Sequence, residues 1–159
     1  MHVAPESRGD KPSIYNLLLK QLDELYMQET DRVANLSNTA ALLKTTFNWW
    51  WVGFYLVKKD ELILGPFQGP VACTRIAFGK GVCGTAWERG SSILVPDVHQ
   101  FEGHIACSAA SNSELVVPIS KNGEVVAVID ADSEHFDHFD SQDKHGMEAI
   151  ASLIAQKVF

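Results

Sequence analysis

Apolar residues recur every three or four positions in the first third of the chain, which is the spacing of one face of an α-helix. The first such face follows Pro12 and Ser13, where the serine is a suitable N-cap. It consists of Ile14, Leu17, Leu18, Leu22 and Leu25. A second face follows Asp31 and consists of Val33, Leu36, Ala40, Leu43 and Phe47. The pattern therefore predicts two consecutive helices.

From residue 50 the pattern changes to aromatic and β-branched residues, which favour strands. The expected strands are 50–57, 61–64, 71–78, 92–95, 115–119 and 124–130. Asn122-Gly123 predicts a tight hairpin turn between the last two strands. A short helix is expected within 79–90, a long loop within 97–113, and a final helix from about residue 140.

Strands grouped in the middle of a chain, with helices at both ends, indicate an α+β fold and not a doubly wound parallel sheet. We expect the terminal helices on one face of a central antiparallel sheet. The long loop and a pocket should then lie on the other face. The 159 residues leave room for one domain, which we place at 13–159. Residues 1–12 have no apolar face and are expected to be a flexible extension.

The net charge of −7 and the lack of clustered Lys and Arg argue against nucleic acid or an anionic membrane as partner. The first residues, MHVAPESRGDK, lack the apolar segment of a signal peptide. We therefore expect a soluble, cytoplasmic protein.

Three cysteines, an odd number, do not suit a secreted disulfide framework. Their thiols must serve packing, metal binding or redox chemistry.

The glycine-rich segment 79–84 matches the G-x-G-x-x-G fingerprint of dinucleotide binding. The helix that follows is too short before Gly90, and the surrounding strands are expected to be antiparallel. We therefore interpret these glycines as a tight turn into a short helix. Cys83 then lies near a helix N-terminus, which favours a thiolate.

The three cysteines, Cys73, Cys83 and Cys107, match no common zinc spacing. Buried packing is the usual role of an intracellular cysteine, but Cys107 lies in a loop of small residues that cannot bury much. Zinc bound with His99 or His104 is an alternative that the ligand spacing disfavours.

Two further histidines, His135 and His138, are assigned to a solvated turn. We therefore expect neither a metal nor a cofactor.

Acidic residues gather at the end of one predicted hairpin. Residues two apart in a strand share a face, so one face should carry Val126, Val128, Asp130 and Asp132. The opposite face should carry Val125, Ala127, Ile129 and Ala131. The turn brings Asp130 and Asp132 back to Glu114, at the start of the neighbouring strand. Mutual repulsion raises the pKa of some of these carboxyls unless a cation offsets it. A solvated strand end is possible, but a bound ammonium group explains the cluster better.

Three successive indoles, Trp49, Trp50 and Trp51, open the first strand. Alternation places Trp50 on one face and Trp49 with Trp51 on the other. Core packing is the stronger expectation for Trp49 and Trp50. Tyr55 shares the face of Trp51, and these two residues are candidates for a pocket wall.

The segments WWWVGFYL, GPFQGP, CTRIAFGKGVCGTAW, HIACSAASNSELVVPI and VIDADSEHFDHFD resemble the free methionine-R-sulfoxide reductases, which are GAF-domain enzymes. The resemblance covers nearly all of residues 13–159 and includes all three cysteines. It implies reduction of free L-methionine-(R)-S-oxide without a cofactor. It also implies a cytosolic homodimer that thioredoxin recycles.

The resemblance assigns roles to eight residues. Cys107 matches the nucleophile, and Cys73 and Cys83 match resolving cysteines, with Cys73 the first disulfide partner. Glu114, Asp130 and Asp132 match the acidic residues that hold the substrate amine and assist the sulfoxide. Trp51 and Tyr55 match the wall around the methyl group.

The implied chemistry agrees with the residues. A thiolate attacks sulfur, a carboxyl with a raised pKa supplies or stabilises the proton that the oxygen gains, and a second thiol captures the sulfenic acid. The alternative is a non-catalytic GAF domain that senses a small molecule such as a cyclic nucleotide. Such a sensor needs no thiols, and the three carboxylates would repel the phosphate of a cyclic nucleotide.

Overall fold

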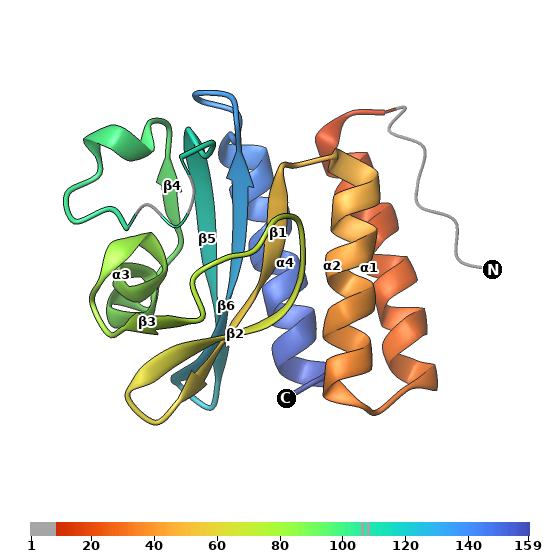
Figure 1. Cartoon of the computed structure of the whole chain (residues 1–159). Coiled ribbons are helices and arrows are strands. Elements are labelled where there is room, and N and C mark those ends of the chain that lie inside the picture. The colour runs from red at the N-terminus through yellow and green to blue at the C-terminus, as the bar shows by residue number, and fades with distance from the viewer. Residues whose placement is uncertain (1–8, 106, 108) are drawn as a thin grey trace.

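A computed structural model describes residues 9–105, 107 and 109–159 of the chain. Its helices are α1 (Lys11–Gln28), α2 (Arg32–Phe47), α3 (Gly81–Arg89) and α4 (Ser141–Lys157), with a 3-10 helix, η1, at Val98–Gln100. In the described part of the chain, no helix is both long and apolar enough to cross a membrane. α1, α2 and α4 stand together on one side of the sheet, and α3 lies on the other (Figure 1).

Each of the three long helices begins at an aspartate whose side chain caps the first turn. Asp31 caps α2, and Asp140 forms a capping box with Asp143 at the start of α4. The N-cap predicted at Ser13 is wrong, because Asp10 accepts a hydrogen bond from the Ser13 backbone N–H. α1 therefore begins at Lys11, and the boundary expected at residue 13 falls inside its first turn. Most of the predicted extension, residues 1–8, lies outside the described residues.

Six strands form one sheet in the order β3-β2-β1-β6-β5-β4. The strands are β1 (Trp51–Lys58), β2 (Glu61–Gln68), β3 (Arg75–Ala77), β4 (Ile93–Val95), β5 (Ser113–Lys121) and β6 (Glu124–Ser133). All five neighbouring pairs are antiparallel, which confirms the predicted α+β class. The predicted turn at Asn122-Gly123 joins β5 to β6 with φ angles of 52° and 81°.

The two faces of the sheet bury separate hydrophobic clusters. The larger cluster packs β1, β5 and β6 against the three long helices, with Leu18, Leu36, Phe54, Ile129 and Ile150 among its members. The smaller cluster lies beneath α3 and the loops of the opposite face. It includes Trp51, Tyr55, Cys83, Val116 and Val128. The three long helices therefore cover one face, as expected, and α3 with the loops covers the other, where a site can form.

The face pattern predicted for β6 holds from residue 127 onward. Ala127, Ile129 and Ala131 face the helices, and Val128 faces the other way. Val125 and Val126 lie on the faces opposite to those predicted. The cause is a β-bulge: Ile119 pairs with Ala127 and Ser120 with Val125, so β6 contains one extra residue.

The glycine-rich segment forms a tight turn into α3, as interpreted from the sequence. Gly79 has a φ of 73°, which favours glycine. A Cβ at Gly84 would lie 2.5 Å from the Ala77 carbonyl oxygen, so a side chain there would collide with backbone. The antiparallel sheet provides no crossover to a parallel strand, and the dinucleotide interpretation is thereby excluded.

Candidate active site

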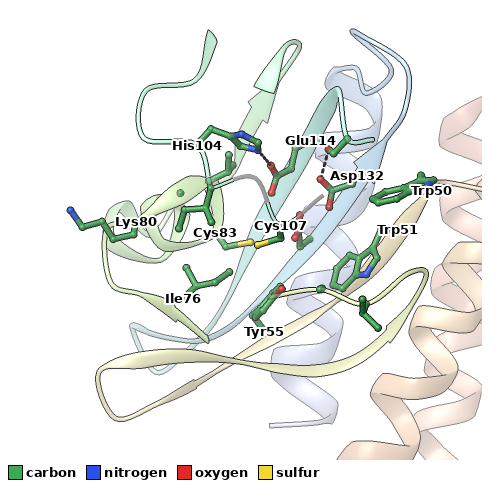
Figure 2. A pocket seen from close by; sticks show the side chains of 17 residues that line it. Trp50, Trp51, Tyr55, Ile76, Lys80, Cys83, His104, Cys107, Glu114 and Asp132 are labelled. Carbon is green, nitrogen blue, oxygen red and sulfur yellow. Dashed lines mark hydrogen bonds and ion pairs between the residues drawn. The ribbon is translucent and has the colours of Figure 1, made fainter. Parts of the chain in front are cut away.

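A cavity of about 60 Å³ opens on the sheet face opposite the long helices (Figure 2). Its walls come from β1, β6, the start of β5, α3 and the segment that carries Cys107. Seven of the eight predicted site residues line it: Trp51, Tyr55, Cys83, Cys107, Glu114, Asp130 and Asp132. The fold thus brings together residues that lie up to 81 positions apart in the sequence.

The eighth residue, Cys73, is joined to Cys107 by a disulfide that spans 34 positions, with their Cα atoms 5.5 Å apart. This is the pairing that the family resemblance implies. Cys107 is exposed, whereas Cys83 is a free, buried thiol. The structure therefore holds the oxidised form of the cysteine pair and leaves one thiol beside it.

The three carboxyl groups meet because of the register between β5 and β6. Glu114 pairs with Asp132, and Asp130 lies opposite Val116, two positions further along β5. Glu114 and Asp130 are each only 6% exposed, which argues against the alternative of a solvated strand end. Oδ1 of Asp130 is buried without a hydrogen-bond partner among the described residues. The cluster is thus a buried acidic site.

Burial is the main electrostatic influence on these acids, because it disfavours the charged form. It raises the pKa of Asp130 to about 6. Burial also raises the pKa of Glu114 and of Asp132 well above their usual range, and the charge of Asp130 adds to both shifts. These carboxyls can therefore hold protons near neutral pH unless a cation approaches them.

Two neighbours of the acids were not predicted from the sequence. The Ser111 hydroxyl donates a hydrogen bond of 2.7 Å to Asp132, and His104 Nε2 lies 3.9 Å from a Glu114 carboxylate oxygen. Dashed lines in Figure 2 mark both interactions. Both residues belong to the loop predicted at 97–113, where no periodicity indicates the direction of a side chain. His104 enters the sequence analysis only as an alternative zinc ligand, and Ser111 is not singled out there.

The aromatic wall of the pocket consists of Trp51 and Tyr55, whose ring centroids are 6.1 Å apart. Phe67 of β2 stacks on Trp51 at 5.2 Å. The Trp51 indole donates a hydrogen bond to the Pro70 carbonyl, and the Tyr55 hydroxyl donates one to the Cys73 carbonyl at 2.8 Å. The Tyr55 bond ties the aromatic wall to the segment that carries one cysteine of the disulfide.

The predicted alternation of the three tryptophans is wrong. Trp49 packs in the helix-side core, stacked on Phe47, whereas Trp50 and Trp51 both line the pocket. Asn48 ends α2 in the left-handed region, with a φ of 52°, and the extended strand begins only at Trp51. Strand alternation therefore does not reach back to Trp49.

The thiolate expected at Cys83 is also contradicted. Burial raises the pKa of this thiol well above its usual value, and the nearby charges of Asp130 and Glu114 raise it further. These influences outweigh the stabilisation of a thiolate by the N–H groups at the start of α3, so Cys83 is a protonated thiol at neutral pH.

The histidines considered as zinc ligands have other neighbours. His99 contacts Asn112, and among the described residues the compact group of potential metal ligands contains no histidine. His138 is half-buried and bonds the Ser133 hydroxyl, so only His135 fits the solvated turn that was expected.

Comparison with known proteins gives the family. The GAF domain family matches residues 34–158. A free methionine-R-sulfoxide reductase of Escherichia coli is 44% identical, over 91% of this chain and 88% of that protein. The chain belongs to the free methionine-R-sulfoxide reductase family. Another member of this family, from Saccharomyces cerevisiae, is 43% identical, over 96% of this chain and 90% of that protein.

A solved structure supports the same family. It is the free methionine-R-sulfoxide reductase of Neisseria meningitidis in complex with its substrate, which superposes with a TM-score of 0.95. The two chains are 50% identical, and the match covers 99% of this chain and 95% of that one. The resemblance inferred from sequence segments is therefore confirmed at the level of family and of the GAF fold.

Proposed function

We propose that this protein reduces free L-methionine-(R)-S-oxide to L-methionine through Cys107. The observation that carries the proposal is a disulfide-forming cysteine in the wall of a pocket that also holds three carboxyls, two of them buried. The named activity of the relatives supports it. A non-catalytic sensor would have no use for a cysteine pair at this position.

Glu114, Asp130 and Asp132 are the proposed binding site for the substrate ammonium. Buried anions are costly unless they are paired, and the Asp130 oxygen without a partner is available to a donor. An ammonium group supplies three N–H donors and a positive charge at once. Methionine within a peptide lacks this group, which restricts the substrate to the free amino acid.

Trp51 and Tyr55 are the proposed contacts of the methyl group. Their rings form an apolar wall held by hydrogen bonds to backbone carbonyls. When the methyl group is fixed there, the R and S epimers differ in one respect: the oxygen of one epimer occupies the position that the sulfur lone pair has in the other. Only one epimer can then present oxygen to the acids and sulfur to Cys107. The choice of the R epimer as the substrate rests on the family resemblance.

The proposed chemistry transfers the sulfoxide oxygen to Cys107. The thiolate attacks the sulfoxide sulfur while a protonated carboxyl of the cluster gives a proton to the oxygen. Methionine leaves, and Cys107 becomes a sulfenic acid. The Cys73 thiol then attacks that sulfur, a disulfide forms, and the hydroxyl leaves as water with the thiol proton. Two thiols are oxidised to a disulfide as the sulfoxide sulfur is reduced.

The disulfide must be reduced before another turnover. Thioredoxin is the proposed reductant, on the family resemblance, and the exposure of Cys107 supports attack by an external thiol. Cys83 is proposed as a second resolving cysteine. A homodimer and a cytoplasmic location are proposed from the resemblance alone.

The proposal is tested by incubating the protein with racemic free methionine sulfoxide and dithiothreitol and following each epimer separately. The R epimer should disappear and the S epimer should remain. Cys107→Ser serves as the inactive control. A sensor would consume neither epimer, and that result would overturn the proposal.

A further inference from the structure

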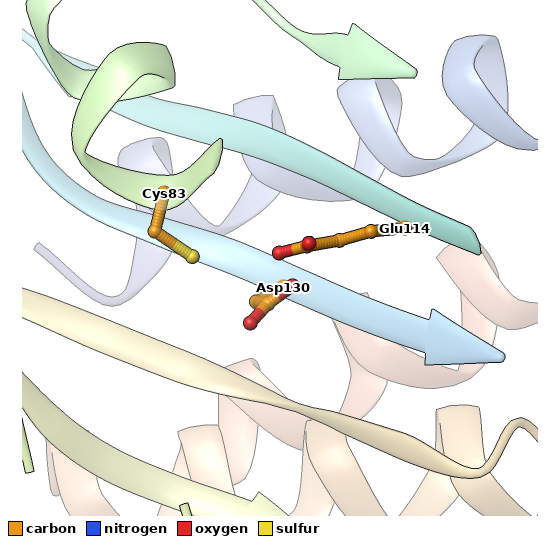
Figure 3. A group of neighbouring side chains, drawn as sticks. All are labelled: Cys83, Glu114 and Asp130. Carbon is orange, nitrogen blue, oxygen red and sulfur yellow. The ribbon is translucent and has the colours of Figure 1, made fainter. Parts of the chain in front are cut away.

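Cys83, Glu114 and Asp130 form a compact group of potential metal ligands inside the pocket. One ligand atom from each residue, a sulfur and two carboxylate oxygens, lies within 4.8 Å of the other two, and all three residues are buried. They come from α3, β5 and β6, and their side chains converge in Figure 3. We propose that this group binds a thiophilic divalent metal ion, of which Zn²⁺ is the favoured example.

The spacing of the ligand atoms suits a small tetrahedral ion. Zinc binds sulfur at about 2.3 Å and carboxylate oxygen at about 2.0–2.2 Å, which places neighbouring ligand atoms roughly 3.3–3.8 Å apart. Since the atoms of this group lie within 4.8 Å of one another, they would have to close by up to about 1.5 Å to reach this spacing. Three protein ligands leave a fourth position that faces the pocket, as in zinc sites that keep one open position.

A second observation points to a cation at the same place. Asp130 is 6% exposed, and its Oδ1 has no hydrogen-bond partner among the described residues. A buried carboxylate oxygen normally accepts at least one hydrogen bond or binds a metal. Cys83, Glu114 and Asp132 all lie close to the Asp130 side chain, yet its Oδ1 accepts no hydrogen bond among the described residues and is left to a ligand.

The sulfur ligand decides which class of ion fits. Magnesium and calcium prefer oxygen ligands alone, whereas zinc and related transition metals bind thiolates. Binding deprotonates Cys83: the metal–sulfur bond forms as the S–H proton leaves to solvent. Metal binding therefore releases a proton from the protein.

This inference goes beyond the proposed reductase activity, because metal binding needs no sulfoxide. The two share Glu114 and Asp130, so the metal and the substrate ammonium exclude each other. A bound ion also occupies the Cys83 thiol, one of the two proposed resolving thiols. The metal is therefore expected to act as a competitive inhibitor and not as a cofactor.

The test uses the full chain in its oxidised state, without reductant. The Cys73–Cys107 disulfide leaves Cys83 as the free thiol of the three cysteines in the sequence. Co²⁺ is titrated in as a spectroscopic probe, and the thiolate-to-cobalt charge-transfer absorption in the near ultraviolet is recorded. Zn²⁺ should then displace cobalt and remove this absorption, and Mg²⁺ should not.

Variants assign the ligands. Cys83→Ser should lose the charge-transfer band. Glu114→Gln and Asp130→Asn should weaken cobalt binding by about tenfold or more, since even outer-shell partners of a metal ligand contribute 10–100-fold. Asp132→Asn is the matched control, because Asp132 lines the same pocket but lies outside the ligand group. It should keep the band and lose less affinity than Asp130→Asn.

The wild-type titration decides the proposal even if a variant fails to fold. Absence of a charge-transfer band at millimolar Co²⁺ would overturn it, as would equal competition by Mg²⁺ or a band that persists in Cys83→Ser. Because no sulfoxide is present, the result is independent of the proposed reaction. A protein that binds cobalt through Cys83 but reduces no sulfoxide would overturn the proposed function alone.

Discussion

Glu114 on β5 and Asp132 on β6 lie directly opposite each other in an antiparallel register. Like charges at opposed positions destabilise a sheet, and burial in this pocket strengthens the effect. The structure tolerates the pair because the pKa of each carboxyl is raised, so that protons replace charge. A cation bound here would let the acids ionise without that cost. The opposed pair Glu114–Asp132 therefore suits the binding of a cation and lowers the stability of the folded protein without one.

The first prediction concerns the cysteines. Cys107→Ser should reduce methionine sulfoxide at no more than the background rate, even with excess dithiothreitol, because no other thiol is proposed to form the sulfenic acid. Cys73→Ser should keep much of the single-turnover reaction, since it lacks only the partner that closes the disulfide. Rapid-quench measurement of methionine formed per protein chain checks both variants. Full turnover by Cys107→Ser would remove the assignment.

The second prediction concerns stability and pH. Asp130 has a pKa of about 6 in the folded protein, above the usual value of 3.8. The folded state therefore binds this proton more tightly than the unfolded state, and stability falls as pH rises from about 4 to above 6. The loss from this residue is roughly 3 kcal/mol at most, at about 1.4 kcal/mol for each pKa unit.

Replacing this acid isolates its contribution. Asp130→Asn should gain stability over the wild type at pH 8 and gain much less at pH 4.5, as measured by urea unfolding. Asp60→Asn, in the exposed β1–β2 turn, is the control that should shift neither value. If the advantage of Asp130→Asn were the same at both pH values, the raised pKa would be wrong.

The third prediction concerns the start of α1. Asp10 caps the helix, and Lys11 forms ion pairs with Asp140 and with the buried Asp143, which also accepts a hydrogen bond from Tyr15. A chain that begins at Gly9 should keep full stability. A chain that begins at Ser13 should lose about 2–4 kcal/mol, from the lost cap and the buried carboxylate left with fewer partners. Equal unfolding midpoints for the two chains would contradict this role of residues 10–12.

Sequence reasoning predicted the fold well where local signals agree with the tertiary structure. The two early helices, the Asn122-Gly123 hairpin and the closing helix each carry a periodic pattern or a turn signal. It failed where a single residue changes the backbone direction. The left-handed Asn48 separates Trp49 from the strand, and the bulge in β6 exchanges the faces of Val125 and Val126. Neither feature has a pattern that alternation can reveal.

The acids of the site could be predicted because strand alternation and one hairpin turn determine where they lie. His104 and Ser111 could not, since a loop has no period that fixes the direction of its side chains. The ionisation of Cys83 was mispredicted for another reason. A helix N-terminus is visible in the sequence, whereas burial against two carboxyls depends on packing between α3, β5 and β6.

The most direct test of the account compares kcat/KM for free L-methionine-(R)-S-oxide and for its N-acetylated form. If Glu114, Asp130 and Asp132 hold an ammonium, acetylation removes the charge that pairs with these buried acids. Losing one charged hydrogen bond costs about 1.5–3 kcal/mol, or roughly tenfold to a hundredfold, and several acids acting together should increase the difference. Asp132→Asn should depress activity on the free amino acid with little change in stability. The account predicts at least about a tenfold preference for the free amino acid, whereas equal kcat/KM for the two substrates would contradict it.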